Sequence, residues 1–288
     1  MFDITLSDDL TVNIDGTSEG TQTKFYDKGY WYKTDTFEEG IVEYLVSKLL
    51  TFSTLPKKSY VVYEYGKING KSGCRSKDFL TPGYELITFE RIHQRITGTK
   101  LSAKKFEFET MESYIEYTVD FFRKYLDLDI KKYLKNTFTL DFITLNEDRH
   151  FNNLAVIYDT KNNKYLTAPI FDNGKSLLNG NRSYRPAFSI EEIIKKVIAL
   201  PFSVSHKKMF DYFGKGFSID IDSALKWLNT EPQSLYRDVL IYQLSVKKFG
   251  VKCEEEIFWF YKTGSDTDCC LCACGVFNVL CNTGRKIF

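Results

Sequence analysis

The sequence predicts an α+β fold in two lobes, a small β-rich N-terminal lobe and a larger, mostly helical C-terminal lobe. Three observations lead to this prediction. Strand and turn signals dominate the first ninety residues, helical periodicity dominates from Met111 onward, and one β-hairpin signal interrupts the helical half. The chain has 288 residues, of which 43% are apolar, so it can bury a sizeable core.

The N-terminal lobe is predicted from short runs of β-branched and aromatic residues, which Asp-Gly, Lys-Gly and Asn-Gly turn signals separate. One helix interrupts these runs over Phe37–Leu50, where apolar residues recur at helical spacing. The predicted strands are Thr11–Ile14, Lys24–Tyr26, Tyr30–Lys33 and Tyr60–Tyr65.

The C-terminal lobe is predicted from apolar residues that recur at i, i+3 and i+4 over Met111–Tyr125 and Ile130–Leu145. Ser189 and Glu192 have the spacing of a capping box, which predicts a helix over Ile193–Leu200. Further helices are expected over Asp222–Leu228 and Ser234–Lys247.

These patterns place the N-terminal lobe at residues 1–90, the C-terminal lobe at residues 91–262, and a tail of unknown role at residues 263–288. Five of the seven cysteines lie in that tail. An odd cysteine count argues against a disulfide framework. The tail has one C-x-x-C step but no nearby histidine, so packed or free thiols are favoured over a metal site.

Charge and hydropathy exclude several classes of protein. The chain carries 39 Lys+Arg and 38 Asp+Glu, a net charge of +1, so direct nucleic-acid binding is not expected. With 16% aromatic residues it is not a disordered chain. No segment approaches the ~20 apolar residues that span a bilayer, and the first residues lack a secretory signal. We therefore expect a cytoplasmic globular protein without membrane contact, although delivery to another cell stays open.

The stretch from Asn146 to Asn153, sequence NEDRHFNN, is the most informative part of the chain. A phosphoryl transferase needs a carboxylate to accept the proton of the attacking hydroxyl, and an Asn and an Asp to hold Mg²⁺. Asp148 and Asn153 have the five-residue spacing that these groups have in protein kinases. The alternative is that an Asp or Asn in a loop only caps a helix or closes a turn.

A predicted hairpin explains how a second acidic residue joins this stretch. Its strands are Leu154–Tyr158 and Tyr165–Phe171, so Asn153 and Asp172 lie at the same open end, about 5 Å apart. Gly174 suits a tight turn just after Asp172.

These two motifs resemble the kinase core of the HipA-like serine/threonine kinases, most closely the short bacterial members. The phosphoinositide lipid kinases, which have a similar Asp-Arg-His-x-x-Asn loop, are the nearest competing family. The resemblance extends more weakly from about Gly16 to about Leu244 and does not include the cysteine-rich tail. It implies a two-lobed protein-kinase-like fold, with ATP and Mg²⁺ as cofactors.

The resemblance also implies roles for individual residues. Asp148 matches the catalytic base, and Asn153 and Asp172 match the magnesium ligands. Lys33 matches the lysine that contacts the ATP phosphates. Glu43 matches the glutamate that forms an ion pair with this lysine. Fewer residues separate Lys33 from Glu43 than is usual in the family, so Glu39, one helical turn earlier, is an alternative partner of Lys33.

Two segments match nucleotide-binding parts of that family. Gly16–Lys24 lies where the family has its phosphate-covering loop, and its small residues Gly16, Ser18 and Gly20 would let backbone N–H groups approach phosphate oxygens. A flexible hairpin turn is the alternative reading. Ser18 is the nearest match to a serine that the family phosphorylates in this loop, which implies autophosphorylation.

The second segment, Cys74–Phe79, resembles the family's link between the lobes, whose backbone binds adenine. Lys77 and Phe79 are the residues of that link that we expect beside the nucleotide.

The sequence thus favours an ATP- and Mg²⁺-dependent protein kinase that phosphorylates Ser or Thr, with an antitoxin protein as a candidate partner. Two alternatives stay open. One is a lipid or small-molecule kinase, and the other is a catalytically weak nucleotide-binding partner of a toxin–antitoxin pair.

Overall fold

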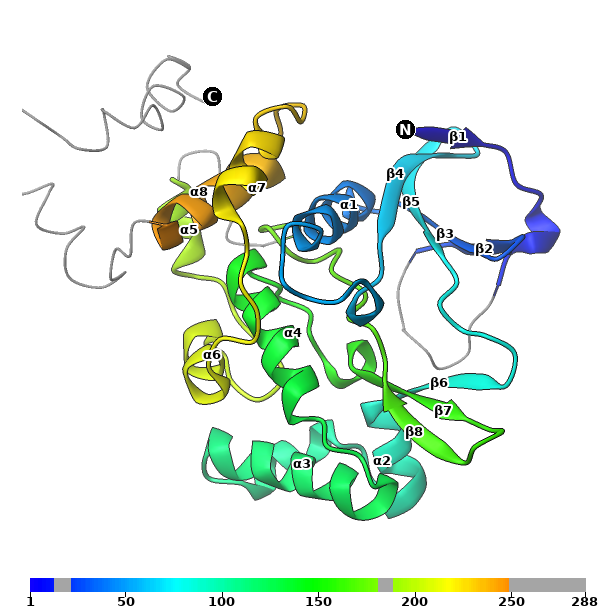
Figure 1. The fold of residues 1–288 in the computed structure, drawn as a ribbon, viewed down its shortest axis with the longest axis vertical. Helices are drawn as coiled ribbons and strands as arrows, with labels where there is room; N and C mark the ends of the chain where they lie inside the picture. Colours follow the sequence, from blue (N-terminus) through cyan, green and yellow to red (C-terminus); the bar gives the residue numbers. More distant parts are fainter. Residues whose placement is uncertain (13–21, 181–188, 249–288) are drawn as a thin grey trace, which may run out of the picture.

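A five-stranded sheet forms most of the N-terminal part of the chain (Figure 1). The computed structural model describes residues 1–12, 22–180 and 189–248. The strand order is β1-β4-β5-β3-β2, with β1 parallel to β4 and the other pairs antiparallel. The strands are β1 (Phe2–Ile4), β2 (Lys24–Asp27), β3 (Tyr30–Thr34), β4 (Tyr63–Ile68) and β5 (Lys71–Lys77).

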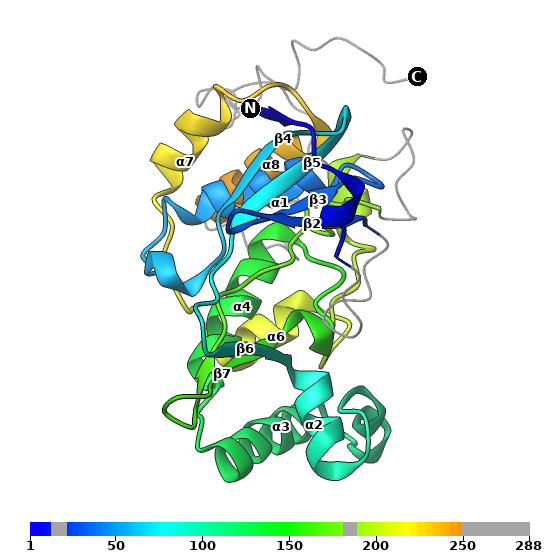
Figure 2. The same ribbon diagram turned by 90° about the vertical axis from the view of Figure 1, so that its right-hand side faces the viewer.

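One helix, α1 (Glu39–Leu50), packs against β4 and β5 of this sheet (Figure 2). Its buried positions Val42, Val46 and Leu49 follow the helical spacing that predicted it. A Cβ atom on Gly40 would lie 2.7 Å from the carbonyl carbon of Gly73 in β5. Glycine at position 40 therefore lets the helix approach the strand closely, which sets the distance between the helix and the sheet.

A second, three-stranded sheet has the order β6-β7-β8, formed by β6 (Tyr84–Thr88), β7 (Ala155–Asp159) and β8 (Lys164–Thr167). The strand β6 pairs with β7, which lies beyond the first four helices in sequence. The change from one sheet to the other therefore occurs between Lys77 and Tyr84, before the lobe boundary that we expected after residue 90. The bounds of the two lobes stay a proposal, with the boundary moved to this connection.

Helices are the main regular structure of the remaining described chain, and the largest hydrophobic cluster joins them to α1. They are α2 (Phe89–Thr97), α3 (Met111–Leu126), α4 (Lys131–Thr144), α5 (Ile190–Ile194), α6 (His206–Phe213), α7 (Ile221–Leu228) and α8 (Leu235–Lys248). Short 3₁₀ turns lie at Asp8–Leu10, Lys57–Ser59, Ser102–Glu107 and Phe151–Asn153. No helix in the described ranges is long and apolar enough to cross a membrane.

The predicted α+β arrangement and most of its elements are confirmed. The helices α1, α3, α4, α7 and α8, the strands β2 and β3, and the hairpin of β7 and β8 lie where the sequence predicts them, within a few residues. The capping box of Ser189 and Glu192 is present, but α5 ends at Ile194 rather than Leu200. Of the predicted strand Thr11–Ile14, Thr11 forms an isolated bridge to Phe25, and residues 13 and 14 lie outside the described ranges.

The strand predicted at Tyr60–Tyr65 is shifted toward the C-terminus, because β4 begins only at Tyr63. Tyr60 forms a parallel bridge to Ile170, and the backbone N–H of Val61 donates to the carbonyl of Ile170. These residues pair with the segment before Asp172 instead of joining the sheet. β1, β5, β6, α2 and α6 were not predicted; β5 in particular, sequence KSGCRSK, lacks the alternation of apolar residues that indicates a strand.

We predict that Gly40→Ala lowers the free energy of unfolding by about 1–3 kcal/mol, because the new methyl group would collide with the backbone of Gly73. Helix propensity alone predicts the opposite sign, a gain of about 1 kcal/mol. Urea unfolding followed by circular dichroism measures the difference. Lys48→Ala in the same helix is the control and should change stability little. A Gly40→Ala variant as stable as the parent would contradict the close approach.

Candidate active site

Arg149 is fully buried, and it organises the loop that follows α4. Its guanidinium meets the carboxylate of Asp141, which lies in the last turns of α4: Nε lies 3.0 Å from Oδ2, and Nη2 lies 3.0 Å from Oδ1. Both side chains have no exposed surface. Breaking a buried pair of this kind leaves an uncompensated charge in the interior, so the two residues depend on each other.

The remaining donors of Arg149 reach three further points of the site. Nη1 donates to the carbonyl of Phe171 at 2.7 Å and to that of Asn153 at 3.3 Å, while Nη2 donates to Oδ1 of Asn173 at 2.6 Å. One side chain thus fixes the loop of residues 146–153 against the segment of residues 171–173. Sequence analysis quoted Arg149 within the motif but gave it no role, because nothing local shows that its side chain is buried.

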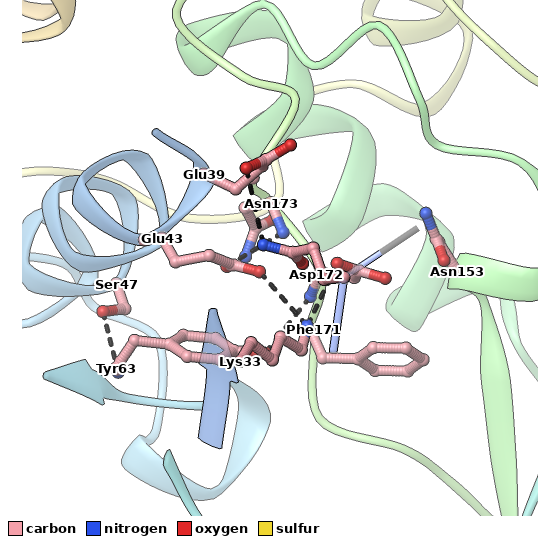
Figure 3. A network of polar contacts seen from close by, with 12 residues as sticks. Lys33, Glu39, Glu43, Ser47, Tyr63, Asn153, Phe171, Asp172 and Asn173 are labelled. Carbon is pink, nitrogen blue, oxygen red and sulfur yellow. Dashed lines mark hydrogen bonds and ion pairs between the residues drawn. The ribbon is translucent and has the colours of Figure 1, made fainter. Parts of the chain in front are cut away.

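Lys33 on β3 forms ion pairs with acidic residues from two other elements (Figure 3). Its Nζ lies 3.2 Å from Oδ1 of Asp172 and 3.6 Å from Oε1 of Glu43 on α1. The second carboxylate oxygen of Glu43 accepts the backbone N–H of Asn173 at 3.0 Å. Glu43 therefore connects the sheet and helix of the N-terminal part to the segment that carries Asp172.

The charges of this network influence one another's ionisation. Burial raises the pKa of Glu43 to about 7, although Lys33 opposes that shift. Burial tends to raise the pKa of Asp172, but Lys33, Lys24 and Arg149 together outweigh it and lower that pKa below its usual value. Burial alone would lower the pKa of Lys33, yet Asp172 and its other neighbours hold it well above the ordinary value. Lys33 and Asp172 thus stay charged at neutral pH.

Glu39, the alternative partner of Lys33 on α1, pairs with a different lysine. Its carboxylate lies 2.9 Å from Nζ of Lys175 and accepts the backbone N–H groups of Thr36 and Phe37 at 3.0 and 2.7 Å. Of the two glutamates left open by the sequence, Glu43 is thus the one that pairs with Lys33.

Asp148 and Asn153 occupy the loop as the spacing suggests, and Nη1 of Arg149 reaches the backbone carbonyls of both Asn153 and Asp172, at 3.3 and 3.5 Å. The side chain of Asp148 is about half exposed, at 48%, and its Oδ1 lies 3.8 Å from Nε2 of His150. Burial, with a further contribution from Asp172, raises the pKa of Asp148, while His150 lowers it. A carboxylate with a raised pKa that faces solvent is suited to accept a proton.

The side chain of Asn153 fits a cation ligand. Its Nδ2 donates to the carbonyl of Asp148 at 2.9 Å, whereas its Oδ1 is buried and has no hydrogen-bond partner among the described residues. A buried acceptor without a partner costs free energy, and a cation would satisfy it. The part of the chain that the structure describes holds no group of three or more His, Cys, Asp or Glu side chains suited to a metal. A metal here would use the Asn153 amide, the Asp172 carboxylate and phosphate oxygens, a set that suits Mg²⁺.

Gly174 lies in a turn just after Asp172, as expected, and the backbone N–H of Ser176 donates to the carbonyl of Asn173 at 3.0 Å across it. Asp172 itself adopts the left-handed conformation, with φ of +58°, which Asp tolerates better than most residues. Glycine is required at position 174 for another reason: a Cβ atom there would lie 2.9 Å from Cβ of Glu39.

A residue that sequence analysis did not assign, Lys24, belongs to the same site. It lies directly opposite Lys33 on the antiparallel pair β2–β3, so both side chains lie on one face of the sheet. Burial and the charge of Lys33 lower the pKa of Lys24, and Asp172 opposes this. The sequence holds a signal for this pairing, because a two-residue turn at Lys28–Gly29 fixes the register that sets Lys24 against Lys33.

Of the two residues expected beside the nucleotide in the link between the lobes, only Phe79 lies in that link. Lys77 is the last residue of β5 and pairs with Tyr30, so Cys74–Lys77 belong to the sheet and the link between sheets begins at Asp78. Phe79 lies in that link. Together with Phe171 it packs against two hydrophobic clusters, one containing Val61, Tyr63 and Cys74 and the other containing Ala155, Ile157 and Ala168. Gly16, Ser18 and Gly20 lie outside the described residues, so their roles stay predictions.

The fold resembles that of a known enzyme. The crystal structure of a Helicobacter pylori proinflammatory kinase, CtkA, matches with a TM-score of 0.57 over 79% of this chain and 90% of that chain. The sequence identity is 17%. Comparison with protein-family models and with curated proteins found no match. The likeness confirms the predicted two-lobed, kinase-like α+β fold.

We predict that Arg149→Met and Asp141→Leu each lower the free energy of unfolding by about 3–5 kcal/mol, because each leaves its partner buried and unpaired. The double variant should lose less than the sum of the two, with a coupling of about 1–3 kcal/mol. Urea titrations of the four proteins measure this cycle.

The control for this cycle is Arg123→Ala, which breaks the exposed pair of Arg123 and Asp120 and should change stability by less than about 1 kcal/mol. Additive effects in the Arg149 and Asp141 cycle would show that the buried pair does not organise the site.

Proposed function

We propose that the protein is an ATP- and Mg²⁺-dependent kinase of the HipA-like type that transfers the γ-phosphoryl group to a Ser or Thr hydroxyl of a protein. The observation that carries this proposal is the buried network of Lys33, Glu43 and Asp172, which faces the unpaired amide oxygen of Asn153. Phosphoryl transfer depends mainly on positioning and on stabilising negative charge, and this network supplies both.

The phosphates of ATP would lie between the sheet and the segment of Asp172. Lys33 would contact them, and Lys24, opposite it on β2, would contribute a second positive charge. Two lysines side by side repel each other, so an anion bound between them would remove that repulsion. When bound, Mg²⁺ would neutralise charge that develops on the phosphate oxygens, with Asn153 and Asp172 as its protein ligands.

The acceptor hydroxyl would lie beside Asp148. The half-exposed carboxylate of Asp148 would orient the hydroxyl and accept its proton as the oxygen attacks phosphorus in line with the leaving group. Arg149 would act as a positioning residue, since its hydrogen bonds hold Asn153 and Phe171 in place without reaching the reacting atoms.

The adenine ring would lie against Phe79 and Phe171, near the link that begins at Asp78. Both side chains are only partly buried, and an aromatic surface of this kind suits a planar base. The backbone groups of the link would then hydrogen-bond the adenine edge.

One feature of the site favours an active kinase over a catalytically weak nucleotide-binding partner. A catalytically weak nucleotide-binding partner would not need a complete set of base, lysine and metal-binding groups, yet Asp148, Lys33, Asn153 and Asp172 are all held around one site. A lipid or small-molecule kinase would use the same phosphate chemistry, so the acceptor distinguishes it from a protein kinase.

We predict that Asp148→Asn lowers the rate of phosphoryl transfer by about 10²–10⁴-fold, because the amide cannot accept the proton of the hydroxyl. ATP binding should persist, since Asp148 makes no contact with Lys33. The measurement is transfer of labelled phosphate from ATP to the protein itself and to a generic protein acceptor. Near-normal transfer by the variant would rule out Asp148 as the base.

We also predict that Asp172→Asn abolishes the part of ATP affinity that depends on Mg²⁺, because the variant loses the only carboxylate of the metal site. Titrations of ATP with Mg²⁺ and with a chelator measure this difference by calorimetry. Asp148→Asn is the matched control and should keep the metal dependence. If Asp172→Asn keeps it as well, Asp172 is only a turn residue.

A further inference from the structure

A cavity of about 320 Å³ lies next to the proposed catalytic loop. Its lining includes His150 and Asn152 of the loop, together with Glu90 of α2 and Lys100 and Lys105 of the segment that follows α2. Tyr114 and Phe151 form part of the lining and pack edge to face, with ring centroids 5.9 Å apart. None of these residues has a role in the site described above, apart from the contact of His150 with Asp148.

Of the Lys, Arg, Asp and Glu side chains that line the cavity, two are lysines and one is a glutamate. Lys100 and Lys105 are exposed, and neither forms an ion pair with any described residue. The neighbouring Lys104, in contrast, pairs with Glu107 at 2.9 Å. Two unpaired ammonium groups that line one cavity attract an anionic ligand.

The acceptor groups of the cavity are already in use. Both carboxylate oxygens of Glu90 accept hydrogen bonds from Ser102, one from its backbone N–H at 2.9 Å and one from its hydroxyl. The hydroxyl of Tyr114 donates to the carbonyl of Leu101 at 2.6 Å. Glu90 therefore supports the turn at Ser102, and its one negative charge still leaves Lys100 and Lys105 in excess on the lining.

Donors, in contrast, are left over. The amide oxygen of Asn152 accepts the hydroxyl of Thr88 at 3.1 Å, so its Nδ2 group remains a donor without a partner among the residues described. Nδ1 of His150 has no hydrogen-bond partner in the described chain, and it donates or accepts according to the tautomer of the ring. The amide of Asn152 and the two lysines thus supply donors to the cavity, as a carboxylate or a phosphate requires.

A single side chain, that of His150, connects the cavity to the proposed base Asp148. His150 lines it, and Nε2 of the same imidazole lies 3.8 Å from Oδ1 of Asp148. An extended peptide advances about 3.3 Å per residue, so a residue within a few positions of the acceptor Ser or Thr would reach the cavity.

We propose that this cavity binds an anionic side chain of the acceptor protein, a carboxylate or a phosphate, close in sequence to the hydroxyl that is phosphorylated. The inference rests on the proposed function for the place of that hydroxyl. Lys100 and Lys105 provide the charge, and Asn152 provides a neutral donor. The cavity thereby selects acidic or already phosphorylated segments over neutral and basic ones.

Peptide binding to the full chain tests this without requiring turnover. The probes are fluorescein-labelled peptides of nine residues with one central serine, whose flanking positions carry aspartate, phosphoserine, alanine or lysine. Fluorescence anisotropy should give about tenfold tighter binding of the aspartate or phosphoserine peptides than of the alanine peptide, and the difference should shrink at high salt. The aspartate and phosphoserine peptides distinguish the two sources of negative charge.

The double variant Lys100→Glu/Lys105→Glu should remove this preference, while Lys132→Glu, which reverses an exposed lysine at the start of α4, should keep it. Equal binding of all peptides, a preference for the lysine peptide, or an unchanged preference in the double variant would overturn the proposal. A separate assay of phosphate transfer from ATP tests the proposed function. Anionic preference without any transfer would support the ligand class of the cavity and refute the kinase activity.

Discussion

The buried guanidinium of Arg149 is the constraint on which the site depends. Burying a charged group costs free energy, and hydrogen bonds to all of its donors are needed to offset that cost when the group has no exposed surface. Asp141 supplies one set of acceptors from α4, and the carbonyls of Asn153 and Phe171 supply others. Satisfying one side chain therefore brings together the end of a helix, the loop of residues 146–153 and the segment before Asp172. The amide oxygen of Asn153 and the carboxylate of Asp172 are positioned in consequence.

A second buried charge extends this arrangement to the N-terminal sheet. Glu43 meets Lys33 through one oxygen and the backbone N–H of Asn173 through the other. Its pKa of about 7 reflects a carboxylate that is buried but kept near its ionised form by Lys33. The close contact of Gly40 with Gly73 sets the position of α1 and hence of Glu43. Helix packing in one part of the molecule thus controls an ion pair that reaches the other.

Two pairs of lysines define two regions of the molecule near the proposed site. Lys24 and Lys33 lie toward the sheet, and Lys100 and Lys105 lie around the cavity beside His150. In the proposed reaction a nucleotide triphosphate meets the first region and an anionic segment of the acceptor protein meets the second. Attraction at both regions would bring two negatively charged reactants toward one carboxylate despite their mutual repulsion. The base itself stays half exposed, where the acceptor hydroxyl can approach it.

The sequence by itself determined the elements with strong periodicity, such as α1 and α4, and the spacing of Asp148, Asn153 and Asp172, because helical repeats and loop motifs are local patterns. It also contained the turn that sets Lys24 opposite Lys33. Only the tertiary structure decided that Glu43 rather than Glu39 pairs with Lys33, since both lie on one helix and the packing of that helix selects between them. The burial of Arg149, the polar strand β5 and the cavity of Lys100 and Lys105 likewise depend on contacts between segments far apart in sequence, which no local pattern encodes.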